Sequence, residues 1–151
     1  MNILLTGACG QLGTELTPLL QNKGQLTLTD RIKPVNGGDN RLAVDVADSA
    51  AVDGLLDDLH PDLIVNAAAY TAVDQAEADK ATAFAVNADF PARLAHWAKR
   101  HDALLLHYST DYVFNGESTV PYRETQAPDP QNIYGESKLA GEQAVADSQC
   151  R

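Results

Sequence analysis

The sequence predicts an α/β fold of the Rossmann type, in which a doubly wound parallel sheet carries helices on both faces. Short apolar segments alternate with longer segments of helical spacing, which is typical of parallel strands joined by crossover helices. The first apolar segment, 2–6, runs directly into a glycine-rich segment, 7–13. Near the other end, Tyr134 and Lys138 lie four residues apart, so one helical turn brings a phenol next to an ammonium group.

Composition limits the classes of protein to consider. The chain has 151 residues, 44% of them hydrophobic and 21% charged, which predicts one ordinary globular domain. A net charge of −10 argues against binding to a nucleic-acid backbone or to an anionic membrane. Two cysteines make no disulfide framework, and the first residues resemble neither a signal peptide nor a membrane span. We therefore expect a reducing compartment, the cytoplasm.

The first half of the chain is expected to form three strands and two helices. In order, they are a buried strand 2–6, a helix 11–22, a strand 25–29 with Asp30 at its tip, a surface loop 33–40, a strand 41–44 and a helix 49–59. Pro18 argues against an unbroken first helix, because proline lacks the backbone donor that a helix interior needs. Either Asp48 or Ser49 is expected to cap the second helix.

The second half continues the alternation. It is expected to contain a buried strand 63–66, a mostly helical segment 76–100, a strand 103–108, a loop 115–132 and a helix from 134 to about 146. The long helical segment should bend near Phe90 and Pro91, because a proline also restricts the residue before it.

The glycine loop is the first chemical element. Gly7 permits a tight turn from strand to helix, Gly10 lets a pyrophosphate approach the backbone, and Gly13 allows the helix to pack closely on the sheet. The free amides at the start of the helix attract the anion. A strand before the loop and a helix after it favour a dinucleotide site over a simple strand end.

Acidic residues follow the next two strands. Asp30 can accept hydrogen bonds from both hydroxyls of an adenosine ribose, which would favour NADH, whereas the adjacent Arg31 can meet the 2′-phosphate of NADPH. The pair leaves both cofactors open. Asp45 and Val46 are placed to bond the adenine amino group and to cover its ring. Small side chains after the fourth strand, 67–69, let a flat cofactor lie against the backbone, although tight packing alone would explain them too.

Tyr134 and Lys138 supply the proton chemistry. A carbonyl that accepts a hydride becomes an alkoxide and must be protonated, yet free tyrosine has a pKa of about 10 and releases its proton reluctantly. The Lys138 ammonium can stabilise the tyrosine anion and can also reach the nicotinamide ribose. Hydroxyls at the end of the fifth strand can hold the carbonyl oxygen, and strand alternation should direct one of Ser109 and Thr110 into the cleft.

With these residues in view, the chain resembles the extended type of the short-chain dehydrogenase/reductase superfamily, and within it the family of dTDP-4-dehydrorhamnose reductases. Four segments carry the resemblance: the glycine loop 7–13 and the segments 65–74, 108–114 and 134–142. The first and last are signals of the whole superfamily. The two middle segments resemble this reductase family more than the sugar epimerases and dehydratases that share the glycine loop.

The resemblance implies a role for each matching residue. It implies Gly10, Gln11 and Leu12 at the pyrophosphate, Asp30 at the ribose, Asp45 and Val46 at the adenine, and Ala69, Tyr70, Thr71 and Tyr108 beside the nicotinamide. It implies Tyr134 as proton donor, Lys138 as its partner and ribose ligand, and Thr110 as the hydroxyl that tunes the tyrosine. Thr110 and Asp111 would contact the sugar. Position 70 carries a tyrosine where we expect a histidine in some relatives.

The implied reaction is reduction of dTDP-4-dehydro-L-rhamnose to dTDP-L-rhamnose by NADPH or NADH. A homodimer and a magnesium ion at a subunit contact would accompany it, with Glu15 as one candidate ligand. Members of this superfamily continue into a further strand and a sugar-binding region, so we expect residues 1–151 to be a cofactor-binding domain without the sugar-binding region, with little turnover alone. Such a chain is a fragment of a longer enzyme, a subunit whose remainder comes from another chain, or a degenerate remnant. Two alternatives stay open, a 4-epimerase with tightly held NAD and a dinucleotide-binding module without catalysis.

Overall fold

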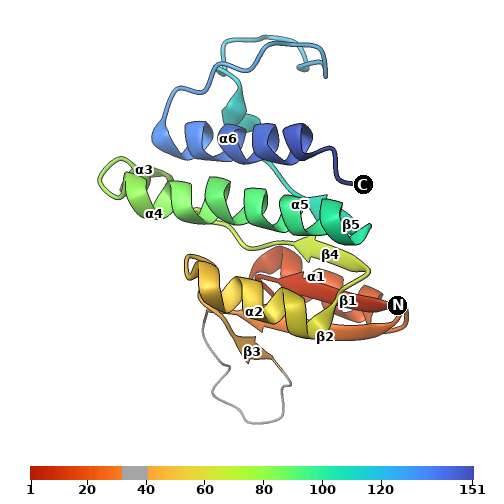
Figure 1. Ribbon diagram of the computed structural model, residues 1–151. Coiled ribbons are helices and arrows are strands. Elements are labelled where there is room, and N and C mark those ends of the chain that lie inside the picture. Colours follow the sequence, from red (N-terminus) through yellow and green to blue (C-terminus); the bar gives the residue numbers. More distant parts are fainter. Residues whose placement is uncertain (32–40) are drawn as a thin grey trace.

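A computed structural model describes residues 1–31 and 41–151, and it has the predicted Rossmann-type architecture (Figure 1). The strands are β1 (Asn2–Thr6), β2 (Gln25–Asp30), β3 (Leu42–Ala43), β4 (Leu63–Asn66) and β5 (Leu104–His107). They form one sheet in the order β3-β2-β1-β4-β5, and every neighbouring pair is parallel. The expected surface loop 33–40 lies outside the described residues.

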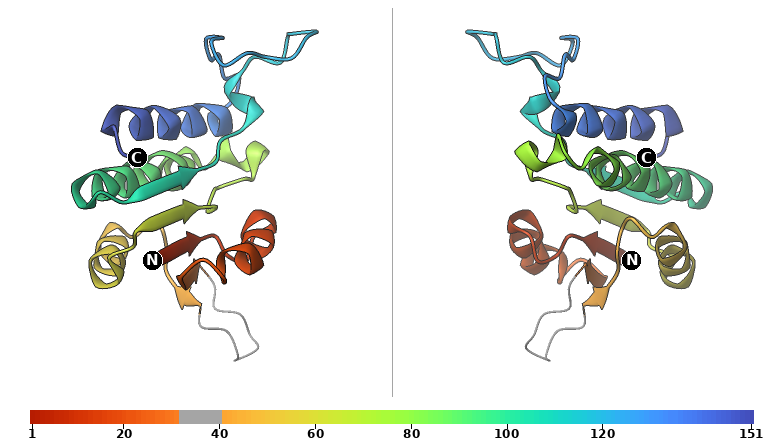
Figure 2. Two further views of the ribbon diagram at one scale, coloured as in Figure 1. Left: turned by 90° about the vertical axis from the view of Figure 1, so that its right-hand side faces the viewer. Right: turned by 90° about the vertical axis from the view of Figure 1, so that its left-hand side faces the viewer.

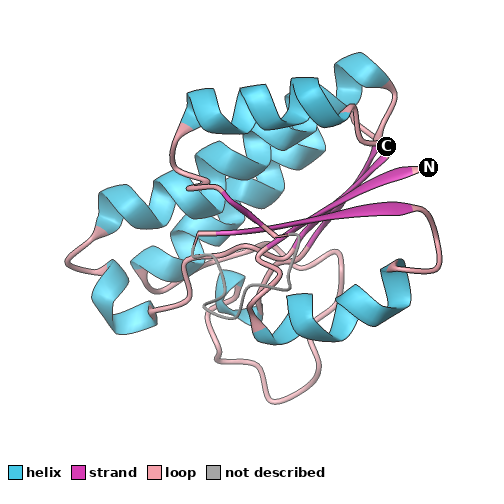
Figure 3. Cartoon of the chain, turned by 90° about the horizontal axis from the view of Figure 1, so that it is seen from below, coloured by secondary structure: helices cyan, strands magenta, loops and turns pink. Residues whose placement is uncertain are grey.

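Helices cover both faces of this sheet. They are α1 (Gln11–Leu20), α2 (Ser49–Leu59), α3 (Val73–Ala76), α4 (Lys80–Phe84), the π-helix η1 (Ala85–Asp89), α5 (Phe90–His101), the 3₁₀-helix η2 (Asp111–Val113) and α6 (Ile133–Ser148). Figure 2 shows α1 on one face and α2 and α5 on the other, with α6 running beside α5. Seen from below in Figure 3, α1 likewise lies apart from the remaining long helices, across the strands.

The core has two layers because side chains alternate along each strand. Leu4 and Ile64 point to the face covered by α2 and α5, where Leu56 and Leu94 meet them. Residues of the opposite parity form a smaller cluster beneath α1: Leu5, Leu28 and Val65, packed against Leu16 and Leu20. Most of the buried apolar surface therefore lies between the sheet and the α2–α5 layer.

The ends of the helices follow ordinary capping chemistry. Asp48, one of the two expected residues, caps α2, and its Oδ1 accepts hydrogen bonds from the amides of Ala50 and Ala51 at 3.0 and 3.1 Å. Helix α1 continues through Pro18 without a break and ends at Leu20, two residues before the predicted end. Pro18 is exposed, so its ring displaces no packed neighbour and the helix loses one backbone donor.

The expected helix 76–100 differs most from its prediction. It consists of three helical segments and a π-helical turn, η1, that ends immediately before Phe90. Pro91 lies in the first turn of α5, where a missing backbone donor costs little, so the proline begins a helix instead of bending one. The predicted bend near Phe90 and Pro91 lies close to the observed π-helical turn. The irregularity comes from the extra residue that this turn accommodates.

No helix among the described residues is both long and apolar enough to cross a membrane.

The edge strand β5 exposes leucines on the sheet face away from α5. Leu104 and Leu106 are 49% and 45% exposed, whereas Leu105 between them is buried. Exposed apolar side chains on an edge strand promote association with other chains. We expect the double substitution Leu104→Thr with Leu106→Thr to reduce self-association in sedimentation velocity while leaving thermal stability nearly unchanged.

Leu105→Thr is the matched control for that variant. Because Leu105 packs into the core, its substitution should lower the free energy of unfolding by about 2–3 kcal/mol. If the double variant were destabilised as strongly as Leu105→Thr, the outer face of β5 would be a packed surface and the expectation would be wrong.

Candidate active site

The expected functional residues gather at one edge of the sheet. Because all five strands are parallel, the glycine loop after β1, the segment after β4 and the segment after β5 leave the sheet at the same edge. Strand order reverses at β1, between α1 on one face and α2 on the other (Figure 2). In open parallel sheets this reversal creates the crevice in which ligands bind.

The glycine loop is shaped for close contact with a ligand. Gly7 has φ of +70°, and a Cβ there would lie 2.6 Å from the Ala67 carbonyl carbon, so glycine is required twice over. A Cβ on Gly13 would lie 2.7 Å from the Cα of Ala8. Gly10 caps α1 and has no side chain with which to bond the first amides of that helix. The helix start can therefore hold a pyrophosphate through backbone amides.

Asp30 connects this loop to β2. Its Oδ2 accepts a hydrogen bond from the Cys9 amide and its Oδ1 accepts one from the Arg31 amide, both at 2.8 Å. An ionised carboxylate has about four acceptor positions, and the hydrogen bonds among the described residues occupy two of those on Asp30. The sequence did not single out Arg41, whose Nη1 lies 3.0 Å from the Cys9 Sγ and brings a second guanidinium to this region.

Asp45 and Val46 form the turn after β3. The Asp45 Oδ1 accepts a hydrogen bond from the Ala47 amide at 3.0 Å, and Val46 packs against the core beneath it. Val46 and Ala47 lie at one end of a groove of about 640 Å³ between α2 and α5. Adenine can be received at that end of the groove.

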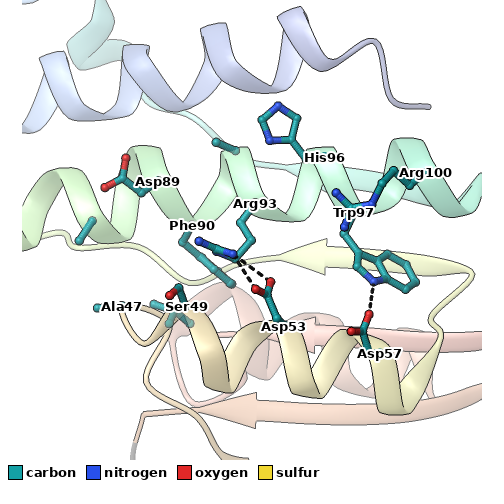
Figure 4. A pocket seen from close by; sticks show the side chains of 13 residues that line it. Ala47, Ser49, Asp53, Asp57, Asp89, Phe90, Arg93, His96, Trp97 and Arg100 are labelled. Atoms are coloured by element: carbon teal, nitrogen blue, oxygen red, sulfur yellow. Dashed lines mark hydrogen bonds and ion pairs between the residues drawn. The ribbon is translucent and has the colours of Figure 1, made fainter.

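Most of this groove is lined by side chains of α2, η1 and α5 (Figure 4). Arg93 Nη1 bonds both oxygens of Asp53 at 3.0 and 2.8 Å, and the Trp97 indole donates to Asp57 at 3.0 Å. These contacts join α5 to α2 across the groove. Of the expected cofactor and catalytic residues, Val46 alone lines the groove.

The segment after β4 is held by a residue that the sequence did not reveal. Asn87 of η1 is 1% exposed, and its amide side chain bonds both the backbone N–H and the C=O of Tyr70, at 2.9 and 3.0 Å. Its Nδ2 also lies 3.0 Å from the Ser137 Oγ on α6. A polar residue within the apolar run 83–88 was the available signal, because buried amides are almost always bonded.

Tyr70 itself turns into the protein. Its ring packs in the cluster that contains Tyr134, and burial, with the Asp79 carboxylate, raises the pKa of the Tyr70 phenol. The phenol therefore holds its proton more firmly than free tyrosine. Ala69 and Thr71, on either side, are exposed at the edge of the site.

The paired Tyr134 and Lys138 lie on α6 as predicted. Asn132 caps the helix through a 2.7 Å bond from the Gly135 amide to its Oδ1, which starts α6 just before the tyrosine. Lys138 is 3% exposed, and its Nζ donates to the Tyr108 carbonyl oxygen at 2.6 Å. Burial lowers the pKa of Lys138, while Glu142 opposes that change. An ammonium is thus held one helical turn from the Tyr134 phenol.

The hydroxyls after β5 come from a turn and not from the strand. We had expected strand alternation to direct one of Ser109 and Thr110 into the cleft. Because β5 ends at His107, both residues lie beyond the strand and alternation does not apply to them. Ser109 is exposed, whereas Thr110 is half-buried and caps η2, its Oγ1 accepting a bond from the Tyr112 amide at 3.3 Å. The Tyr112 ring meets the Tyr134 ring edge-on at 5.5 Å, so this turn packs directly on the start of α6. The Asp111 side chain is exposed.

A magnesium site finds no support. Glu15 is exposed on α1, and no group of three or more His, Cys, Asp or Glu side chains in residues 1–31 and 41–151 is arranged to hold a metal ion.

Comparisons with known proteins place the chain in a family. The model of the RmlD substrate binding domain family matches residues 1–151. The chain is 46% identical over 148 residues to a dTDP-4-dehydrorhamnose reductase of Burkholderia thailandensis, covering 98% of this chain and 46% of that protein. It spans about half the length of the curated relatives it matches.

Solved structures give the same result. A dTDP-4-dehydrorhamnose reductase of Clostridium acetobutylicum superposes with a TM-score of 0.86 at 36% identity, over 97% of this chain and 49% of the other. One from Bacillus anthracis, solved in complex with NADP, has a TM-score of 0.83 at 35% identity, over 96% of this chain and 49% of the other.

Proposed function

This chain belongs to the family of the RmlD substrate binding domain, and from that membership we propose that it supplies the cofactor site and the proton donor of a dTDP-4-dehydrorhamnose reductase. The reaction is reduction of the 4-keto group of dTDP-4-dehydro-L-rhamnose by NADPH or NADH. The observation that carries the proposal is the buried Lys138, held by Tyr108 beside Tyr134 at the edge of the sheet where the glycine loop lies.

The cofactor would lie along this edge of the sheet. The amides of Gly10, Gln11 and Leu12 hold the pyrophosphate, between the turns that Gly7 and Gly13 permit. Asp30 accepts from the adenosine ribose while Asp45 and Val46 receive the adenine. At the other end, the nicotinamide would be held beside four residues: Ala69, Tyr70, Thr71 and Tyr108. The Bacillus anthracis dTDP-4-dehydrorhamnose reductase solved in complex with NADP supports a nicotinamide dinucleotide here.

A bound reduced nicotinamide would supply the hydride that forms the new C–H bond at the carbonyl carbon. As the C=O π bond breaks, the oxygen takes the Tyr134 proton, so the ketone becomes an alcohol and the tyrosine a phenolate. Lys138 stabilises that phenolate by its charge and also bonds the ribose. Thr110 holds the carbonyl oxygen, and Thr110 with Asp111 contacts the sugar. Solvent then returns a proton to Tyr134.

Titration of NADPH and NADH against the chain tests the cofactor site. We expect the fluorescence of the reduced nicotinamide to rise on binding, and Gly13→Ala to weaken binding by at least about a hundredfold, because its Cβ would press on the loop. Gly54→Ala in α2 is the matched control, because apart from the helix's own backbone no atom of the described residues lies within 4 Å of the new Cβ.

Three outcomes separate the possible functions. Absence of dinucleotide binding would contradict the proposal outright. NAD that remains bound through purification, together with no net consumption of NADPH when the keto-sugar is added, would identify a 4-epimerase. Binding without turnover in the protein that contains this chain would identify a dinucleotide-binding module.

A further inference from the structure

His107 is the last residue of β5 and takes part in no step of the proposed reaction. Its ring lies half-buried at the edge of the sheet where the strands end, between Asn66 at the end of β4 and helix α6. A histidine in such a position can simply fill space. The hydrogen bonds around it give it a more specific role.

The orientation of Asn66 is determined by two donors. Its Oδ1 accepts a bond from the Thr6 hydroxyl at 2.7 Å and another from the Ala68 amide at 3.2 Å. Turning the side chain over would place an NH₂ group against the Ala68 N–H, two donors facing one another. Asn66 therefore directs its Nδ2 toward His107, where the Nδ1 lies 3.1 Å away.

This contact assigns the protonation of the ring. Because Asn66 Nδ2 can donate but not accept, the Nδ1 of His107 must be the acceptor and the proton of the neutral ring must be on Nε2. Nε2 is buried and has no hydrogen-bond partner among the described residues. It faces α6 at a point 3.6 Å from where a Cβ on Gly141 would lie, one turn beyond Lys138.

The next residue along the chain connects the ring to the lysine. Tyr108, bonded to His107 through the peptide link, presents the carbonyl oxygen that accepts from the Lys138 Nζ. A continuous set of contacts thus runs from Thr6, immediately before the glycine loop, through Asn66 and His107 to Lys138.

We propose that His107 is a positioning residue for Lys138, in which a neutral imidazole anchored on Asn66 holds the Tyr108 carbonyl against the lysine ammonium. The inference rests on the proposed function of Lys138 as a ligand of the nicotinamide ribose. It adds that Lys138 stays in position only while His107 is uncharged. A second ring proton, on Nδ1, would face the Asn66 NH₂ group and break the hydrogen bond between Asn66 and His107.

The surroundings of His107 keep it uncharged. Burial, and to a lesser extent the charge of Lys138, lower the pKa of His107 to about 4. The Asn66 side chain that bonds the ring is neutral, and η1 brings the uncharged backbone carbonyl of Asn87 to the same point of α6. On α6, Lys138 carries the charge that acts on the ring, and Glu142 acts on Lys138.

The unaltered chain allows a direct test by NMR. Long-range ¹H–¹⁵N correlations should show His107 with a bare Nδ1 and a protonated Nε2, and no titration of this ring above about pH 5. The chain has four histidines, and the signals that disappear in His107→Asn identify the right one. The other tautomer, or titration near the ordinary histidine pKa of about 6.5, would overturn the proposal.

Two substitutions separate positioning from space-filling. Asparagine places an oxygen close to the position of Nδ1 but leaves a gap, whereas phenylalanine fills the space and removes the acceptor. We expect His107→Asn to keep NADPH affinity within about threefold and to leave the Lys138 Nζ resonance in place. His107→Phe should weaken NADPH binding about tenfold and shift that resonance. If phenylalanine preserved both signals better than asparagine, the role would be packing alone.

These measurements test the role of His107 separately from the proposed binding of the cofactor. Failure of the unaltered chain to bind NADPH or NADH would contradict the proposed function. The His107 tautomer and the Lys138 resonance are read without cofactor, so they would still decide whether the ring positions the lysine.

Discussion

Gly141→Ala is expected to lower the free energy of unfolding by about 2–4 kcal/mol, although alanine is the better helix former by about 1 kcal/mol. A Cβ at Gly141 would fall well inside van der Waals contact with the Asn87 carbonyl oxygen of η1. That oxygen belongs to the backbone and cannot swing aside. Helix α6 would have to move away from η1 and α5, carrying Lys138 with it.

Thermal and urea unfolding followed by circular dichroism measure this loss. Gly54→Ala is the matched control, since Gly54 also lies within a helix, but a new Cβ there meets nothing within 4 Å in the part of the chain that the structure describes, its own helix backbone aside. It should stabilise the chain by about 0.5–1 kcal/mol through helix propensity alone. Equal effects of the two substitutions would mean that α6 does not press on η1 as closely as the structure has it.

Helix α6 was predictable from the sequence, but its packing against η1 and η2 was not. Asn132 caps the helix, and the residues after it have helical spacing. The observed bounds, Ile133–Ser148, agree with the prediction to within two residues. Nothing in that local pattern indicates a partner. Gly135 and Gly141 are poor helix formers within this helix. They are needed because a Cβ at either position would press on the backbone of η2 or η1, which are distant in the sequence.

The sheet was predictable for a related reason. Buried parallel strands are continuous apolar runs, and β4 was predicted at its observed bounds, Leu63–Asn66. The edge strand β3 covers Leu42–Ala43 and is shorter than the expected 41–44, because a strand at the edge has one neighbour to define it. The segment 76–100 was harder, since a π-turn has no local signature beyond the proline that follows it.

For the candidate site, the sequence indicated residues whose chemistry is visible locally. A glycine loop and a tyrosine–lysine pair at helical spacing are such patterns. Asn87 and His107 were missed because their importance comes from contacts across the fold, with Tyr70, Ser137 and Asn66. A buried amide in an apolar helix and a histidine at a strand end are weak signals until those partners are known.

Tyr134→Phe is expected to reduce the rate of keto-sugar reduction by about 10²- to 10⁴-fold while leaving NADPH affinity nearly unchanged. The phenyl ring keeps the packing of Tyr134 against Ala76, Ala83 and the Tyr112 ring, so the fold should persist. What disappears is the proton that the alkoxide requires. The measurement is NADPH oxidation with dTDP-4-dehydro-L-rhamnose, in the protein that contains this chain.

Lys138→Met separates the two roles proposed for the pair. Methionine retains most of the apolar length of the lysine but cannot bond Tyr108, so we expect this variant to lose turnover and also to bind NADPH about tenfold more weakly. A purely structural lysine would affect stability without this difference between binding and rate. If Tyr134→Phe kept its activity, another group would have to protonate the alkoxide, and the Tyr70 phenol is poorly suited because its pKa is raised. The proposal therefore requires that Tyr134→Phe lose turnover but keep NADPH affinity, and that Lys138→Met lose turnover and also bind NADPH more weakly.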